Sequence, residues 1–195
     1  AYTSLEDALA LARRYREARN FTVAERAYRD ILDAEPEHGQ SRYELGLVCY
    51  FRGNIQEAYQ HVRQALEILP PDPERQANFG TIAYIYGDAD EGIAAWREAI
   101  RLDPQNVGAR ANLAKVLVDL SRSEEAATLC REALELQPDH DGALLHLGLA
   151  LQATGQFAEA VATWEDLIAR RPNHATALSN LANAYRDQGR TADSE

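Results

Sequence analysis

The sequence lacks several residue types that most chains of its length contain. It has no methionine, two cysteines and a single lysine, Lys115. A chain without methionine has no start codon of its own, so we expect a processed N-terminus or a piece of a longer protein. No apolar run approaches the roughly 20 residues that a membrane-spanning helix needs, and no signal peptide with a basic start and an apolar middle is visible. We therefore expect no membrane insertion.

Basic side chains are scarce relative to acidic ones. The chain carries 31 acidic and 20 basic residues, which gives a net charge of -11. A strongly acidic surface repels a phosphate backbone, so the composition argues against nucleic acid as a ligand. It favours solubility, or a partner that carries basic groups.

The most informative feature that is present is a fixed period. Prolines recur 34 residues apart, at Pro36, Pro70, Pro104, Pro138 and Pro172. A period of this length is typical of arrays of helical hairpins, in which each unit buries its apolar face against its neighbours. We expect one array over residues 1–195, with units at 5–38, 39–72, 73–106, 107–140 and 141–174 and a partial unit at 175–195.

Aligned columns support this register. One column holds only small residues, which let two helices approach closely: Ala12, Gly46, Gly80, Ala114, Gly148 and Ala182. Another column lies in the turn inside each unit and carries glycines suited to a positive φ, namely Gly53, Gly87, Gly155 and Gly189. A third column adds a core residue from the second helix of each full unit: Tyr28, Val62, Trp96, Cys130 and Trp164.

The two cysteines fit the same register. Cys49 and Cys130 lie two units apart. Because packed helix axes lie about 8–10 Å apart, these residues should exceed the ~7 Å between Cα atoms that a disulfide tolerates. We therefore expect two reduced core cysteines and a cytoplasmic location, while a periplasmic location or a membrane-tethered longer chain remains the alternative.

Three segments carry a family likeness: LGLVCY at 45–50, LGLALQ at 147–152 and NLANAYRDQGR at 180–190. Together with the recurring small, apolar and proline columns, they resemble the tetratricopeptide repeat. The resemblance covers nearly the whole chain. It implies an all-α fold, a right-handed solenoid of stacked antiparallel helical hairpins.

The resemblance also implies where a ligand binds, because in this family the first helix of each unit lines a concave groove. The positions that it assigns to a peptide-binding groove are Tyr43, Leu47, Tyr50, Asn78, Thr81, Tyr84, Asn112, Lys115, His146, Leu149, Gln152, Asn180 and Asn183. Asn78, Asn112 and Asn180 share one column, as do the asparagine ladders of O-linked N-acetylglucosamine transferases. A side-chain amide both donates and accepts, so such a ladder pairs with an extended peptide backbone. The alternative is that these asparagines only cap or solvate helices.

Aromatic residues gather in the second and third units. Tyr43, Tyr50, Phe51 and Tyr84 form a cluster that we expect to be partly exposed in the groove, since tyrosine gives large and rigid contact area. The alternative is that these rings pack between adjacent units.

Catalytic motifs are missing from the sequence. It contains no glycine-rich phosphate loop, no His-Glu-x-x-His and no Gly-x-Ser-x-Gly. His38, His140 and His174 occupy the same inter-unit turn and are therefore spread along the array, so we expect no metal site. We likewise expect no cofactor and no enzymatic activity within these residues.

The sequence thus favours a non-catalytic protein–protein interaction scaffold that holds an extended peptide or a partner helix in its groove. Two alternatives remain. The chain is the substrate-recruiting arm of a larger enzyme such as a glycosyltransferase, or it is a self-assembling module.

Overall fold

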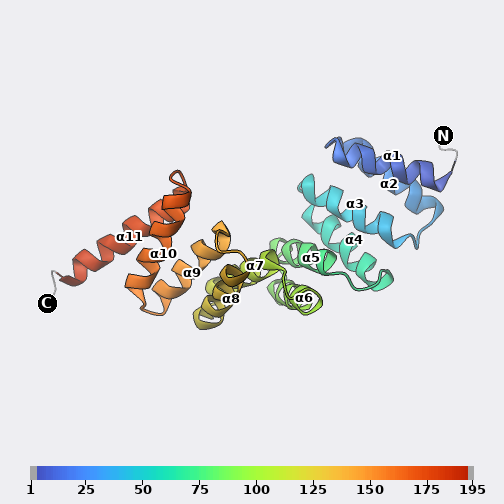
Figure 1. Cartoon of the computed structure of the whole chain (residues 1–195). Coiled ribbons are helices and arrows are strands. Elements are labelled where there is room, and N and C mark those ends of the chain that lie inside the picture. Colours follow the sequence, from blue (N-terminus) through green and yellow to red (C-terminus); the bar gives the residue numbers. More distant parts are fainter. Residues whose placement is uncertain (1–3, 193–195) are drawn as a thin grey trace. The chain divides into compact units, whose positions relative to one another are not determined.

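The computed structural model describes residues 4–192, with side chains as far as residue 186. Within these residues the chain forms helices only, and it divides into two compact units at Leu102 and Asp103 (Figure 1). The first unit contains α1 (Leu5–Glu17), α2 (Phe21–Ala34), α3 (Gly39–Phe51), α4 (Ile55–Ile68), α5 (Pro73–Tyr86) and α6 (Ala89–Leu102). The second contains α7 (Val107–Asp119), α8 (Ser123–Leu136), α9 (Asp141–Ala153), α10 (Phe157–Arg170) and α11 (Ala175–Ala192).

Successive helices pack against one another in both units, which confirms the all-α solenoid class of the fold. Each connection is short, so a helix and its successor form a hairpin whose facing sides are apolar. In the second unit α7 also packs on α9, and α9 on α11, so helices that open successive hairpins lie side by side. None of the described helices is both long and apolar enough to cross a membrane.

Side-chain caps begin several of the helices. Ser4 caps α1, Asp72 caps α5 and Asn106 caps α7, each by accepting a hydrogen bond from the backbone N–H three residues later. Such a cap satisfies one of the backbone donors that a helix start leaves without an intrahelical partner.

The turn inside each hairpin requires a left-handed residue. Gly53, Gly87 and Gly155 adopt positive φ, as the sequence predicts. Two hairpins place a residue with a side chain at the same point, because Arg19 has φ 56° and Ser121 has φ 59°. Outside glycine this conformation costs roughly 1–2 kcal/mol per residue. The geometry of the hairpin therefore overrides residue preference at these two turns.

The small-residue column lets the two helices of a hairpin touch. A Cβ added at Gly46 would lie 2.5 Å from Val62 Cγ2, one at Gly80 would lie 2.7 Å from Trp96 Nε1, and one at Gly148 would lie 2.2 Å from Trp164 Nε1. Contacts that short would force the facing side chain to move, so glycine at these three positions avoids overpacking the hairpin.

Where the column holds alanine, the facing residue differs. Ala12 is aligned with Tyr28, and Ala114 is aligned with the smaller Cys130; all four are fully buried. Cys49 is also fully buried, and both cysteines are free, which confirms their assignment to the core.

One sequence prediction about the backbone is wrong. We expect a turn at Gly189, but α11 continues through that position to Ala192. A glycine inside a helix costs only about 1 kcal/mol relative to alanine, and the continuing backbone hydrogen bonds of the helix offset this cost. The division into six units is not tested by these helix bounds and stays a prediction, and residues 1–3 and 193–195 of that division lie outside the described residues.

Candidate functional site

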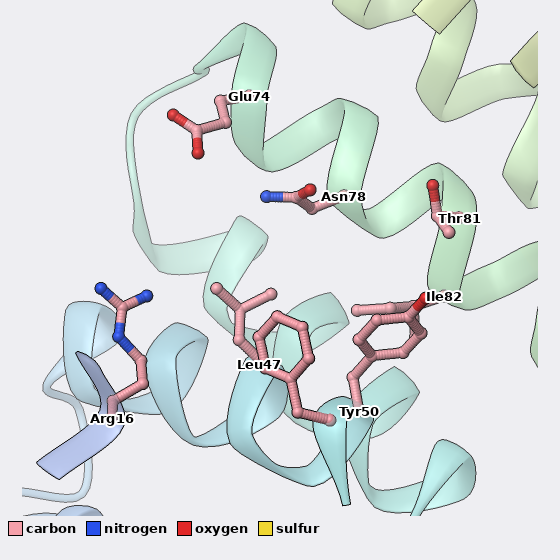
Figure 2. A pocket seen from close by; sticks show the side chains of 8 residues that line it. Arg16, Leu47, Tyr50, Glu74, Asn78, Thr81 and Ile82 are labelled. Atoms are coloured by element: carbon pink, nitrogen blue, oxygen red, sulfur yellow. The ribbon is translucent and has the colours of Figure 1, made fainter. Parts of the chain in front are cut away.

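A cavity of about 370 Å³ opens in the first unit between the helices that begin its hairpins. Figure 2 shows Leu47 and Tyr50 reaching it from α3, and Asn78 and Thr81 reaching it from α5. These four residues belong to the predicted groove. The complete lining also includes Arg16, Phe51, Glu74 and Ile82.

The floor and one wall of the cavity are apolar. Ile82 is almost fully buried, and Leu47 is half-buried beside it in the lining. Tyr50 meets the ring of Phe51 edge to face at 5.5 Å between centroids, and Phe51 stacks on Phe21 at 5.3 Å. Ring pairs at these distances are held in place by packing, so Tyr50 presents a rigid contact surface.

Asn78 is held by a neighbouring ring. Its Nδ2 donates a hydrogen bond to Tyr43 Oη at 2.8 Å. Burial raises the pKa of Tyr43 to about 12, because a buried phenolate loses its hydration, so the phenol stays neutral at ordinary pH. The amide of Asn78 has a second N–H and a carbonyl oxygen with two lone pairs, which gives it further capacity toward a ligand.

Tyr43 itself departs from the prediction. The sequence predicts that it is partly exposed in the groove, but its exposed fraction is 6%. The ring lies beneath Asn78, and the Arg75 guanidinium carbon lies 6.0 Å from its centroid. Tyr43 therefore supports a groove residue and has little surface of its own to offer a ligand.

Charges of both signs border the cavity. Arg16 forms an ion pair with Glu44 at 2.9 Å between Nη1 and Oε2, and the Glu44 side chain is buried. Glu74 is exposed at the rim (Figure 2). Glu44 is the residue of the second unit that aligns with Asn78 in the predicted asparagine column. A peptide-binding asparagine ladder would need an amide there, but the position holds a buried carboxylate that is paired with Arg16.

The remaining predicted residues lie outside this cavity. Tyr84 is half-buried and its ring centroid lies 6.1 Å from that of Trp96, inside its own hairpin. The others belong to the second unit: Asn112, Lys115 and Asn183 are exposed, whereas His146, Leu149, Gln152 and Asn180 are half-buried. The structure therefore brings together one compact subset of the predicted groove.

His146 shows how the asparagine column behaves in the second unit. Burial lowers the pKa of His146, although a hydrogen bond with the backbone of Ala111 acts in the opposite direction. The Nδ2 of Asn180, in the same column, is buried and has no hydrogen-bond partner among the described residues. The side chains of His146 and Asn180 are therefore partly buried against the protein and do not lie fully open to a ligand.

Comparison with known proteins decides the family. A family profile described as tetratricopeptide repeat matches residues 9–73, 79–141 and 145–195. The chain belongs to the tetratricopeptide repeat family. Tetratricopeptide repeat proteins are generally non-catalytic modules that bind proteins or peptides, and this one is a protein-interaction scaffold. The comparison with curated protein sequences found no significant match.

Solved structures of other tetratricopeptide repeat proteins share the fold. YrrB, described as having an unusual peptide-binding site, is 18% identical with a TM-score of 0.81, covering 90% of this chain and 91% of its own. The MamA protein is 20% identical with a TM-score of 0.79, covering 88% of this chain and 93% of its own. A tetratricopeptide repeat protein from Parabacteroides merdae ATCC 43184 is 17% identical with a TM-score of 0.83, and the match covers 97% of this chain and 75% of its own.

Sequence reasoning missed one role in this tetratricopeptide repeat protein. Each inter-unit histidine caps the helix that follows it, because its Nδ1 accepts a hydrogen bond from the backbone N–H three residues later. The pairs are His38 with Ser41 at 3.1 Å, His140 with Ala143 at 3.1 Å and His174 with Ala177 at 3.2 Å. Asp72 and Asn106, which make the same bond, stand at equivalent positions between units. That alignment was a signal for a capping position, although it does not fix the orientation of the histidine rings.

It also missed a group of potential metal ligands. The sequence predicts no metal site, and it considers only the spread of the histidines. The α3–α4 hairpin brings Cys49, Glu57 and His61 together, with one ligand atom from each within 4.8 Å of the others. The spacing of Glu57 and His61, one helical turn apart, was the available signal.

Proposed function

We propose that the first unit binds an extended peptide through the cavity between α1, α3 and α5. The observation that carries this proposal is the convergence of Leu47, Tyr50, Asn78 and Thr81 on one space. Their side chains supply an apolar wall, a rigid aromatic ring, an amide and a hydroxyl. The peptide-binding site described for YrrB, a protein of the same fold, supports the same class of ligand.

The cavity dimensions fit part of a peptide. A volume of about 370 Å³ lies at the small end of the roughly 300–1,000 Å³ typical of ligand pockets. It accommodates one or two side chains, so the rest of the ligand would lie across the rim. We expect Asn78 to pair with the ligand backbone and Leu47 and Ile82 to contact an apolar side chain, because all three line the cavity.

Charge bears on the sequence of the ligand. Glu74 stands exposed at the rim, and the net charge of the chain is -11. Arg16 is partly neutralised by its ion pair with Glu44. The field at the rim therefore favours a peptide with basic residues beside its apolar anchor.

A peptide-display selection tests the proposal. Random peptides are selected on the full chain, and the affinities of the recovered peptides are measured against Asn78→Ala and Tyr50→Ala. Loss of a hydrogen bond of about 1.4 kcal/mol weakens binding tenfold, so we expect at least that loss for Asn78→Ala. Asn54→Ala is the matched control, because Asn54 is exposed and its side chain makes no cap bond.

Two results would count against this function. Peptides that bind all variants equally do not use the cavity, and the proposal then fails. Peptides that also lose affinity for Asn54→Ala would show that the effect is general to the fold. Selected peptides should in addition be enriched in basic residues around an apolar anchor.

Self-association is a second candidate, because apolar side chains are exposed on α11. The exposed fractions are 43% for Leu178 and 48% for Tyr185. We propose Leu178→Ser with Tyr185→Ser as the disrupting pair. Sedimentation velocity over a concentration series should show association for the wild type and a loss of it for the pair. A wild type that stays monomeric throughout would eliminate this candidate.

A further inference from the structure

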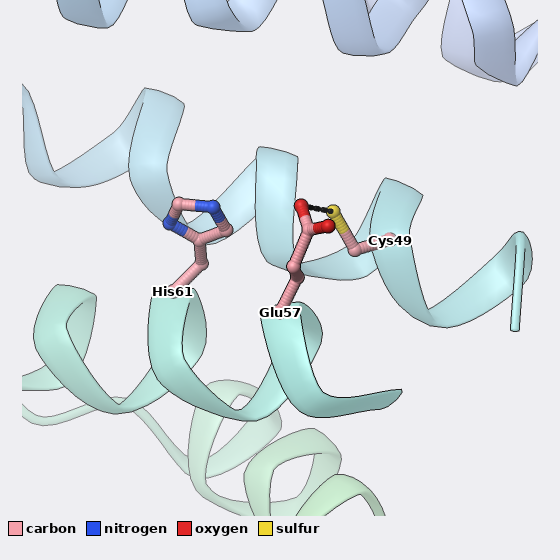
Figure 3. Close-up of side chains that lie close together, drawn as sticks. All are labelled: Cys49, Glu57 and His61. Carbon is pink, nitrogen blue, oxygen red and sulfur yellow. Dashed lines mark hydrogen bonds between the residues drawn. The ribbon is translucent and has the colours of Figure 1, made fainter. Parts of the chain in front are cut away.

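Three chemically distinct side chains meet inside the α3–α4 hairpin. Cys49 comes from α3, and Glu57 and His61 come from α4 (Figure 3). One sulfur, one carboxylate oxygen and one ring nitrogen all lie within 4.8 Å of one another, and Cys49 Sγ lies 3.9 Å from Glu57 Oε2. The thiol is fully buried, while the other two side chains are half-buried.

The geometry of the hairpin explains the convergence. Glu57 and His61 are four residues apart, so they share one face of α4. Cys49 belongs to the core column of α3 and points at that face (Figure 3). The meeting of these side chains therefore follows from the same register that packs the hairpin.

An ion-pair network orients the carboxylate. Arg29 Nη2 donates to Glu57 Oε2 at 2.5 Å, and Arg29 also pairs with Glu25. Glu25 is buried and pairs with Arg52 as well. Oε2 is also the oxygen that the Cys49 thiol contacts, so a cation bound in the cluster would share Oε2 with Arg29 or move Arg29 to Oε1.

His61 supplies an imidazole nitrogen to the cluster. Burial lowers the pKa of His61, and the nearby Arg42 acts in the same direction. His61 Nδ1 is buried without a hydrogen-bond partner among the described residues. Figure 3 shows this nitrogen on the side of the ring away from Glu57 and Cys49, so the nitrogen that faces the cluster, and that would bind a metal there, is Nε2.

We propose that Cys49, Glu57 and His61 bind one Zn²⁺ ion. Thiolate, imidazole and carboxylate are the ligands that zinc takes in proteins, at about 2.3, 2.0–2.1 and 2.0–2.2 Å. Those bond lengths place tetrahedral ligand atoms roughly 3.3–3.7 Å apart. The observed separations, at most 4.8 Å, need a contraction of about 1–1.5 Å at the widest pair, which side-chain rotation supplies.

Coordination changes the protonation of one group. The thiol proton passes to solvent when the S–Zn bond forms, because the thiolate is the ligand. Three protein ligands leave a fourth tetrahedral position for water or for a donor atom from a binding partner. The soft thiolate selects zinc over magnesium or calcium, which prefer oxygen ligands.

Cobalt(II) is the probe for the first experiment, since Zn²⁺ itself has no absorption in the visible range. Co²⁺ is added to the full chain and the thiolate-to-cobalt charge-transfer band is recorded. We expect one equivalent to bind, and stoichiometric Zn²⁺ to displace it. Cys49→Ser should abolish the band. Cys130→Ser, which changes the other cysteine of the chain, should leave it intact.

Further variants separate coordination from folding. His61→Gln and Glu57→Gln each remove one ligand at a half-buried position and should weaken Co²⁺ at least tenfold while helicity by circular dichroism is kept. Zn²⁺ should raise the melting temperature of the wild type but not of Cys49→Ala. The assignment is overturned if the wild type shows no charge-transfer band, if the band survives in Cys49→Ser, or if Cys130→Ser also loses it.

Discussion

The contact between Gly148 and Trp164 gives the sharpest test of how these hairpins pack. We predict that Gly148→Ala destabilises the protein by about 2 kcal/mol. An added Cβ would lie 2.2 Å from Trp164 Nε1 and 2.4 Å from Cε2. Favourable contacts between such atoms begin near 3.5 Å, so the indole would have to retreat by roughly 1.3 Å.

The magnitude follows from three contributions. Overpacking a core of this kind costs about 1–3 kcal/mol. Trp164 is fully buried and donates to the Leu145 carbonyl at 3.3 Å, so its displacement also threatens a hydrogen bond worth about 1 kcal/mol. Replacing glycine by alanine in a helix returns about 1 kcal/mol. The sum is a net loss of about 2 kcal/mol.

Urea unfolding followed by circular dichroism measures this free energy. Gly108→Ala is the matched control, because a Cβ there would lie 3.7 Å from Asn106 Oδ1, an ordinary contact, at an exposed site. We expect it to be neutral or slightly stabilising. A change of midpoint at constant slope would confirm that only native-state stability has moved.

A second background separates crowding from other causes. The fourth predicted unit pairs Ala114 with Cys130, so Trp164→Cys should create room for alanine at position 148. In that background Gly148→Ala should cost nothing, which corresponds to a coupling energy of about 2 kcal/mol. An equal loss in both backgrounds, or a stable Gly148→Ala single variant, would refute the reasoning.

Three further predictions concern turns, caps and pH. Arg19→Gly should stabilise the chain by up to about 1 kcal/mol in urea unfolding, because it removes a side chain from positive φ; no gain would contradict this. His140→Ala should lose about 1 kcal/mol and His140→Asn almost nothing, and equal losses would show that the cap is unimportant. Burial lowers the pKa of His146 in the folded state, so the folded protein binds this proton less readily than the unfolded chain does. The contribution of His146 to folding stability is therefore complete above pH 6.5 and is lost as the pH falls below it. The free energy of unfolding of His146→Gln should fall less steeply with acid than that of the wild type.

The helical repeat could be predicted from the sequence because it rests on local signals. Prolines after the second helix of each pair, glycines in the turns and a column of small residues act over short stretches of the chain. Gly53, Gly87 and Gly155 have the positive φ that their position predicts. Gly189 does not follow the pattern, because the turn also depends on a second helix that packs back, and α11 continues straight through the position.

The candidate groove could be predicted in part. Leu47, Tyr50, Asn78 and Thr81 line the cavity because of their positions in the helical register. That register can be read from the spacing of residues in the sequence. Burial of Tyr43 could not be predicted, because it depends on which neighbouring side chains fill the surrounding space.

Two other features depended on rotamers. The histidine caps require a specific orientation of Nδ1 toward the next helix, and a column of aligned residues does not fix that orientation. Likewise, the sequence places Cys49 and His61 in different columns, so their proximity to Glu57 emerges only when α3 and α4 are docked. Contacts that cross a helix pair need the volumes and rotamers of both partners, which a single aligned column does not contain.

The matching of small residues to bulky ones has a practical consequence for protein engineering. Glycine faces tryptophan in two hairpins and valine in another, while alanine is aligned with cysteine in a fourth and with tyrosine in the first. Grafting one helix alone into a different repeat would create either a steric overlap or a void. The smallest transplantable piece of this chain is therefore the complete helix pair, and libraries of shuffled repeats should be cut at the prolines between pairs.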